Sequence, residues 1–185
     1  MWPFSQKYNY LYYPVMVSFL DLRNRLPRRR LDKLKVCNVG VGEGGSALAL
    51  QLPYFNFARL DHIDVHQPYL DAARARTWSA KVVNFINTDV RNWNFAAYDY
   101  VFMFDVLEHL EKADALAVME KIKCHQLIFI PLETMFRKND FGVKAQDHLS
   151  FWTEADFKER GYTTEILSGF HIEEKSVFDA LWALK

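Results

Sequence analysis

Glycine is scarce in this chain and concentrated at one place. Four of the seven glycines stand at positions 40, 42, 44 and 45, directly after the short apolar run at residues 34–40. A buried strand followed by a glycine-rich turn lets a ligand approach the main chain without interference from side chains. A helix-forming segment, residues 46–52, comes next, so its first N–H groups would face the same ligand. The sequence therefore predicts a strand, a binding turn and a helix in that order.

The remainder of the sequence alternates between apolar runs and helix-forming segments. Including the first run, the predicted strands are 34–40, 60–65, 81–86, 98–104, 126–131, 162–167 and 176–184. The further predicted helices are 15–25, 68–78, 112–123 and 153–160, and the last has a capping pattern, Thr153 with Asp156, and Gly161 just past its end. Strands that alternate with helices at this spacing form a doubly wound sheet. We therefore expect an α/β, Rossmann-like fold with seven strands, mostly parallel and with a C-terminal antiparallel strand.

Composition and charge exclude several classes of protein. Half of the 185 residues are hydrophobic, which is enough for a sizeable core and rules out an intrinsically disordered chain. Lys plus Arg equals Asp plus Glu, 23 of each, so general nucleic-acid binding is not expected. No apolar run reaches the roughly 18 residues of a membrane-spanning helix. Cys37 and Cys124 lie in apolar runs and are expected to be reduced. These features predict a cytoplasmic protein that does not enter a membrane.

The length corresponds to one domain, at about 150 residues per domain. Residues 1–33 differ from the rest, with an aromatic beginning and a basic end. We expect them to form an N-terminal helix or lid and a basic connector. Residues 34–185 are expected to form a single ligand-binding domain, and the sequence does not indicate an oligomeric state.

Two aspartates stand where predicted strands end. Asp64 closes the strand at 60–65, where a carboxylate can accept hydrogen bonds from both hydroxyls of a ribose. Asp89 follows the strand at 81–86, where it can accept from an adenine amino group. The pattern Gly40-x-Gly42-x-x-Gly45 also fits the fingerprint of dinucleotide-binding proteins. An NAD-linked oxidoreductase is therefore an alternative.

The glycine turn, the two aspartates and the stretch 98–110 together resemble the class I S-adenosylmethionine-dependent methyltransferases, over residues 34–184. The stretch 98–110 resembles that family's fourth-strand motif, which separates a methyltransferase from a dehydrogenase. The resemblance implies S-adenosylmethionine as cofactor, with its methionine part at the glycine turn, its ribose at Asp64 and its adenine at Asp89. The implied cofactor-binding residues are Asn38, Gly40, Gly42, Asp64, Val65, Asp89, Val90, Phe104 and Asp105.

One position departs from the family's pattern. Asn38 stands two places before the first glycine, where the family commonly has an acidic residue. An amide oxygen accepts a hydrogen bond but brings no negative charge. The sequence is therefore also compatible with a methyltransferase-like binding subunit that has no activity.

Two histidines are the candidates for catalysis. His109 is expected to begin the helix after the fourth strand, and His148 stands just before the helix at 153–160. Both segments border the mouth of the pocket in sheets of this topology, where a histidine can act as general base. The stretch at 148–152 resembles glycan-associated bacterial methyltransferases. This resemblance implies a small-molecule or sugar-like acceptor, with oxygen as the acceptor atom.

The same region resembles the metal ligand set of small-RNA 2′-O-methyltransferases. Asp105, Glu108 and His109, with His148 downstream, supply the two acidic residues and two histidines of that set. Oxygen and imidazole ligands suit a divalent metal. Because Leu-Glu-His-Leu is also widespread in methyltransferases without a metal, no metal ligand is assigned from the sequence, and the metal is kept as a hypothesis.

Overall fold

The structure is a computed structural model that describes residues 25–26, 30–42, 50–51, 53–132, 142–173 and 176–185. The expected helices at 15–25 and 46–52 fall almost entirely outside the described residues, as does most of the expected lid at 1–33. The described ranges contain both strand-end aspartates, Asp64 and Asp89, and both candidate catalytic histidines, His109 and His148.

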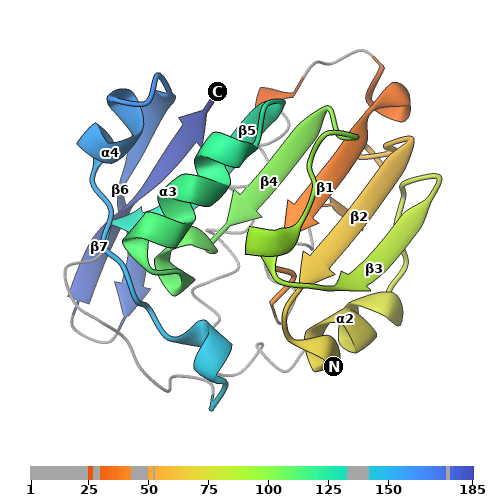
Figure 1. The fold of residues 1–185 in the computed structure, drawn as a ribbon, viewed down its shortest axis with the longest axis horizontal. Helices are drawn as coiled ribbons and strands as arrows, with labels where there is room; N and C mark the ends of the chain where they lie inside the picture. Colours follow the sequence, from red (N-terminus) through yellow and green to blue (C-terminus); the bar gives the residue numbers. More distant parts are fainter. Residues whose placement is uncertain (1–24, 27–29, 43–49, 52, 133–141, 174–175) are drawn as a thin grey trace.

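Seven strands form one sheet in the order β3-β2-β1-β4-β5-β7-β6. They are β1 (Lys35–Val39), β2 (Arg59–Asp64), β3 (Val83–Asn87), β4 (Tyr100–Phe104), β5 (His125–Leu132), β6 (Thr163–Glu173) and β7 (Ser176–Leu184). The arrows of β1 to β4 point the same way in Figure 1, and β5 pairs with β4 in parallel. Strand β7 runs antiparallel to both β5 and β6. The predicted Rossmann-like α/β fold, with seven strands and a C-terminal antiparallel strand, is confirmed.

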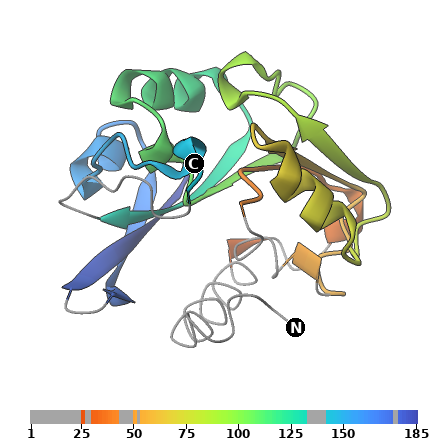
Figure 2. The same ribbon diagram turned by 90° about the horizontal axis from the view of Figure 1, so that it is seen from below.

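The central strands are apolar because both faces of the sheet are covered. On one face Val39, Met103 and Ile130 belong to a core that α3 (Lys112–Lys121) completes. On the other face Val36 and Trp182 belong to a second core. Figure 2 shows α3 lying along one side of the sheet. These two cores hold the carboxyl ends of the strands in fixed relative positions.

The predicted cap of the last helix is present. Helix α4 (Glu154–Lys158) begins after Thr153, whose N–H donates to Asp156 Oδ2 at 2.7 Å. Gly161 follows the helix with a φ of 78°, a left-handed conformation that favours glycine. The thiols of Cys37 and Cys124 are both free, as predicted. No helix in the described part of the chain is both long and apolar enough to span a bilayer.

Three predicted boundaries were clearly wrong, while the others within the described residues differ from the structure by at most two residues. Helix α2 (Gln67–Arg74) ends before Trp78, because the Trp78 indole N–H donates to the Ala73 carbonyl at 2.9 Å, which a longer helix would use. Strand β6 runs past residue 167 to Glu173, with an irregular register between Leu167 and His171.

The third wrong boundary concerns His109, which does not begin a helix. It ends a short 3-10 turn, η5 (Leu107–His109), and α3 starts three residues later. The main-chain carbonyl of Glu108 accepts from the N–H groups of Leu149 and Ser150, at 2.6 and 3.1 Å. Because that carbonyl is used by another segment, it is not available to continue a helix through His109.

Candidate active site

A cavity of about 520 Å³ lies at the carboxyl ends of the central strands. Residues 144–146 and Leu149 form part of its wall on the side of the late loop. It brings together most of the site residues expected from the sequence: Gly40, Gly42, Asp64, Val65, Asp89, Val90, Phe104, Asp105 and His109. Asn38 and His148 are not among the residues that line it.

The glycine turn has the backbone that only glycine adopts easily. Gly40 and Gly42 have φ values of 69° and 53°. A Cβ at Gly40 would lie 2.6 Å from Cγ2 of Val106, so this position excludes a side chain by contact as well as by conformation. The Gly40 N–H donates to the carbonyl of Ile63 at 2.9 Å, which ties the turn to β2.

Asp64 organises the turn from the end of β2. Its Oδ2 accepts from the N–H groups of Val41 and Gly42, at 2.8 and 3.1 Å, and its Oδ1 accepts from the N–H of His66 at 2.7 Å. The side chain is largely buried but still lines the cavity. A carboxylate held in this way is preorganised to accept further hydrogen bonds from a ligand.

Asp89 is held by an arginine that the sequence analysis missed. The side chain of Asp89 caps the 3-10 turn η4 (Val90–Asn92) by accepting from the N–H of Arg91. The Arg91 guanidinium forms ion pairs with Asp89 at 2.5 Å and with Asp114 at 2.8 Å, and it also lines the cavity. Hydrogen bonds from this guanidinium hold the pKa of the Asp89 carboxyl below its usual range. Arg91 stands two residues after Asp89, and this spacing is the sequence signal that would have identified it.

Apolar surface and backbone strain lie side by side at the end of β4. Phe104 is buried and its ring stacks on Phe102, with centroids 5.4 Å apart. Asp105, the next residue, has a φ of 52°, which is uncommon outside glycine and costs free energy. Across the cavity Val65 is 58% exposed, an unusual exposure for a valine directly after a buried strand. A flat apolar ligand group would cover it.

Asn38 faces away from the cavity. It is fully buried on β1, and its side-chain amide lies 3.1 Å from Nδ1 of His62 on β2. Burial lowers the pKa of His62 to about 3, so this imidazole is neutral. Asn38 and His62 therefore form a neutral polar pair inside the sheet layer.

The two candidate catalytic histidines lie together although 39 positions separate them in the sequence. The rings of His109 and His148 meet edge to face, with centroids 4.8 Å apart. Nδ1 of His109 lies 3.2 Å from the main-chain carbonyl of Asp147, and Nε2 lies 4.0 Å from Oε1 of the buried Glu108. Ligand atoms of Glu108, His109 and His148 all lie within 4.8 Å of one another, close enough to hold a metal ion. Asp105, the fourth residue of the hypothetical metal set, is not in that group.

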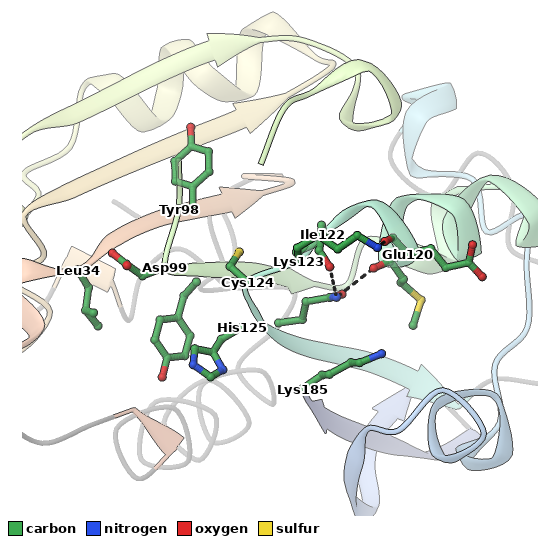
Figure 3. Close-up of a pocket in the computed structure, with 12 residues that line it drawn as sticks. Leu34, Tyr98, Asp99, Glu120, Ile122, Lys123, Cys124, His125 and Lys185 are labelled. Atoms are coloured by element: carbon green, nitrogen blue, oxygen red, sulfur yellow. Dashed lines mark hydrogen bonds between the residues drawn. The ribbon is translucent and has the colours of Figure 1, made fainter. Parts of the chain in front are cut away.

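A second hollow, of about 970 Å³, lies at the opposite ends of the strands. Figure 3 shows Tyr98, Asp99 and His125 around it, with Lys185 on its far side. Its polar groups are largely occupied by protein partners. The Lys185 ammonium donates to the carbonyl of Arg160 at 2.8 Å, and Gln126 Nε2 donates to two carbonyls of α3 and its end. Size alone therefore does not identify the binding site.

Comparison with known families gives one match. Residues 36–125, which run from β1 to the start of β5, match the family model described as a methyltransferase domain. No curated protein sequence matches the chain. The matched range contains the glycine turn, both aspartates and the end of β4.

Several solved methyltransferase structures have the same fold. The CurJ carbon methyltransferase is 14% identical, with 92% of this chain and 53% of that chain covered and a TM-score of 0.63. The N-methyltransferase NodS from Bradyrhizobium japonicum is 17% identical, with 96% of both chains covered and a TM-score of 0.60. The methyltransferase domain of a bacterial Hen1 is 18% identical, with 94% of this chain and 98% of that chain covered and a TM-score of 0.58. This chain thus spans about half the length of the CurJ methyltransferase chain.

Fold and cavity define an α/β protein that binds a nucleotide-like ligand where the parallel strands end. The match of residues 36–125 to a methyltransferase domain, together with these similar structures, supports a class I S-adenosylmethionine-dependent methyltransferase. The family, the enzyme class and the cofactor predicted from the sequence are confirmed, and the NAD-linked alternative is not favoured. The similar structures include a carbon and a nitrogen methyltransferase, so the fold does not determine the acceptor atom.

Proposed function

We propose that this enzyme transfers a methyl group to a hydroxyl oxygen of a small, hydrophilic, sugar-like acceptor, with His109 as general base. The observation that carries the proposal is the 3.2 Å contact between Nδ1 of His109 and the carbonyl of Asp147. Because a carbonyl only accepts hydrogen bonds, Nδ1 carries the hydrogen of the neutral ring. The lone pair of the neutral ring is then on Nε2, which is the atom that can take a proton.

The residues of the cavity suit S-adenosylmethionine. Gly42 leaves room for close approach of a ligand to the main chain, since a Cβ built there has no heavy atom within 4 Å and the residue lines the cavity. The Asp64 carboxylate would accept from the ribose hydroxyls, Asp89 would accept from the adenine amino group, and the exposed Val65 would cover one face of an apolar ring. When bound, the cofactor supplies a methyl group on a positively charged sulfur.

The chemistry left to the protein is positioning and removal of one proton. The acceptor hydroxyl gives its proton to Nε2 of His109 and forms the new bond to the methyl carbon, while the electron pair of the carbon–sulfur bond stays with sulfur. Holding two reactants in line can lower a barrier by about 7–11 kcal/mol. A positioned general base contributes a further factor of about 10² to 10⁴.

A hydrophilic acceptor is supported by the polar side of the cavity. Lys144 and Gln146 line it next to His109, and His148 lies behind His109. Hydroxyls of a sugar-like acceptor can hydrogen-bond to such groups. The resemblance of the stretch 148–152 to glycan-associated methyltransferases favours the same class of acceptor.

The test is release of S-adenosylhomocysteine with panels of free sugars, polyols, phenols and amines. We expect turnover with a sugar or polyol, and a fall in kcat of about 10²-fold or more for His109→Gln. His125→Gln is the matched control, because His125 stacks on Tyr100 at the opposite ends of the strands. Turnover with amines alone, or an unchanged kcat in His109→Gln, would overturn the proposal. Binding of S-adenosylhomocysteine without turnover on any acceptor would favour a binding subunit.

A second candidate is favoured by the grouping of Glu108, His109 and His148 within 4.8 Å. One carboxylate and two imidazoles suit Mg²⁺ less well than Mn²⁺ or another transition metal. A metal there would act as a Lewis acid on the acceptor hydroxyl, and His109 would then be a ligand instead of a base. Turnover that is lost with EDTA and restored by Mn²⁺ is expected for this candidate. Turnover indifferent to EDTA would exclude it.

Two expectations about the whole chain are also proposals. Residues 1–33 would form a lid and connector outside the domain at 34–185, and Leu26 and Leu31 support a packed connector because both are buried. Deletion of residues 1–13 should then weaken cofactor binding, and unchanged affinity would discard the lid. A cytoplasmic location is supported by the two free thiols. Localisation of a tagged chain tests it.

A further inference from the structure

Residues 147–152, which we call the strap, run across the turn η5 and are bound to it by buried hydrogen bonds. The N–H groups of Leu149 and Ser150 both donate to the Glu108 carbonyl. The Ser150 hydroxyl donates to the carbonyl of Leu107 at 3.1 Å and accepts from the indole N–H of Trp152 at 3.0 Å. Ser150 and Trp152 are buried, so these bonds are shielded from water.

Lys112 joins the far end of the strap to two helices. Its ammonium donates to the carbonyl of Phe151 at 2.6 Å and to Asp156 Oδ2 at 2.8 Å. The same ammonium lies 3.8 Å from the centre of the Trp152 ring, within the range of a cation–π contact. Lys112 is the first residue of α3 and Asp156 belongs to α4, so one side chain connects both helices to the strap.

The position of Lys112 is not one that helix formation favours. A cation in the first turn of a helix opposes the helix dipole, which favours anions there. The contacts with Phe151, Trp152 and Asp156 offset that cost. A lysine at this position is therefore explained by what it holds and not by the helix it begins.

We propose that Lys112 and Ser150 are positioning residues that lock the strap in place and thereby fix which nitrogen of His109 is the base. The strap supplies two of the groups that face His109, the carbonyl of Asp147 at Nδ1 and the ring of His148, while Oε1 of Glu108 lies 4.0 Å from Nε2. A strap that moves away from η5 removes the acceptor at Nδ1, and the neutral ring is then free to carry its hydrogen on Nε2. This inference rests on the proposed function, because it assigns the Nε2 lone pair a role.

The first test reads the hydrogen position directly and requires no activity. Nitrogen-15 spectra of the histidine side chains would be recorded two units above the ordinary histidine pKa of about 6.5, where the rings are neutral. The His109 signal is identified by its loss in His109→Gln. We expect the Nδ1–H form in the wild-type chain and in Lys112→Arg, which keeps the charge. Lys112→Met should shift His109 towards the Nε2–H form.

The matched control is Lys158→Met, which removes an exposed lysine that pairs with Glu154 on α4. It should leave the His109 signal unchanged. Trp152→Phe, which keeps an aromatic ring near Lys112 but removes the indole donor to Ser150 and part of the ring volume, is the second lock variant. It should produce a smaller shift in the same direction, and it serves as the test if Lys112→Met does not fold.

The second test separates positioning from general stability. In Lys112→Met we expect kcat to fall by about 10-fold to 100-fold, with the affinity for S-adenosylhomocysteine unchanged, and Lys112→Arg should restore most of the rate. A folded Lys112→Met with the wild-type Nδ1–H signal would overturn the lock. If the wild-type chain methylates no acceptor, the proposed function fails, while the spectra still decide whether the lock exists.

Discussion

Strand β2 carries a buried carboxylate near each of its ends, and the two are used differently. Near the amino end Asp61 accepts from the side chains of Arg59, Asn84 and Tyr98, its hydrogen-bond partners among the described residues, at distances of 2.6–2.8 Å. At the carboxyl end Asp64 accepts from main-chain N–H groups of a turn whose glycines have left-handed φ values. The Asp61 carboxylate is fully buried among its side-chain partners. The Asp64 carboxylate holds the main chain of the glycine turn and also lines the cavity.

The hollows at the two ends of the strands show a similar difference. The hollow at the amino ends is nearly twice as large, about 970 Å³ against 520 Å³, yet its lysines donate to protein carbonyls. The smaller cavity is lined by a strained Asp105, an exposed Val65 and a histidine. Strain and exposed apolar surface at one place indicate function more directly than volume.

The largest expected effect is near the amino end of β2. Asp61→Asn removes the carboxylate that pairs with the half-exposed Arg59 and accepts from the buried Tyr98 hydroxyl, and it should lower the free energy of unfolding by about 3 kcal/mol. Urea unfolding at neutral pH measures it. The affinity of the folded chain for S-adenosylhomocysteine should not change. Wild-type stability in Asp61→Asn would contradict the structural role of Asp61. A stable variant that does not bind S-adenosylhomocysteine would contradict the assignment of binding to the carboxyl end alone.

The same carboxylate predicts a pH dependence. Burial alone would raise the pKa of Asp61, but hydrogen bonds from Arg59, Tyr98 and Asn84 outweigh it and hold the pKa below its usual range. A group whose pKa is depressed by folding stabilises the protein above its unfolded pKa, about 3.9 here. That contribution is lost as the pH falls through the lower, folded pKa. The wild-type chain should therefore lose stability more steeply below about pH 4 than Asp61→Asn does. Equal acid dependence would contradict this account.

The next effect is at the carboxyl end of β2. Asp64→Ala removes the acceptor of three main-chain N–H groups and should weaken S-adenosylhomocysteine binding by about 100-fold, or about 2.7 kcal/mol. Asp99→Ala is the matched control, because Asp99 accepts a main-chain N–H from Lys35 beside the other hollow. It should bind as the wild-type chain does in calorimetric titration. Equal losses in both variants would mean that the effect is not local to the cavity.

A smaller effect distinguishes the steric contact of a Cβ at Gly40 from the cost of its left-handed conformation. Gly40→Ala adds a Cβ 2.6 Å from Val106 Cγ2 at a φ of 69°, and we expect a loss of stability of about 1–3 kcal/mol. Gly161→Ala has a φ of 78° but no heavy atom within 4 Å, so it should cost less. Adding Val106→Ala to Gly40→Ala should recover part of the loss. Thermal unfolding of the wild-type chain, Gly40→Ala, Gly161→Ala and the double variant checks this. Equal losses of stability in Gly40→Ala and Gly161→Ala would mean that contact with Val106 does not add to the cost.

The smallest effect concerns Arg91. Its ion pairs with Asp89 and Asp114 are largely exposed, and exposed pairs contribute about 0.2–1 kcal/mol. Arg91→Gln should therefore reduce S-adenosylhomocysteine affinity by about 2–5-fold, and by less in high salt. Lys121→Gln, a nearby exposed cation on α3, is the control. A loss of 100-fold in Arg91→Gln would instead mean direct contact with the ligand.

Sequence patterns anticipated what depends on local chemistry. Apolar runs predicted the strands, the Thr153–Asp156 pair predicted the cap, and the ends of strands predicted Asp64 and Asp89. Contacts between distant segments were not predictable. The turn at His109 exists because residues 149 and 150 take the Glu108 carbonyl, and Asn38 faces His62 because of the register of β1 with β2. The stretch 148–152 resembles a known motif, but nothing in that pattern indicates a contact with Lys112, so the lock was missed.

The most direct test of the central claim, that the cavity at the carboxyl ends holds the cofactor, is thermal unfolding with S-adenosylhomocysteine and, in parallel, with NADH. At about a hundred times its dissociation constant, S-adenosylhomocysteine should raise the midpoint by about 5–10 °C. We expect that shift in the wild-type chain and in Asp99→Ala, its fall to about 1–2 °C in Asp64→Ala, and no shift with NADH. A shift with NADH alone, or one that survives Asp64→Ala and disappears in Asp99→Ala, would contradict the account.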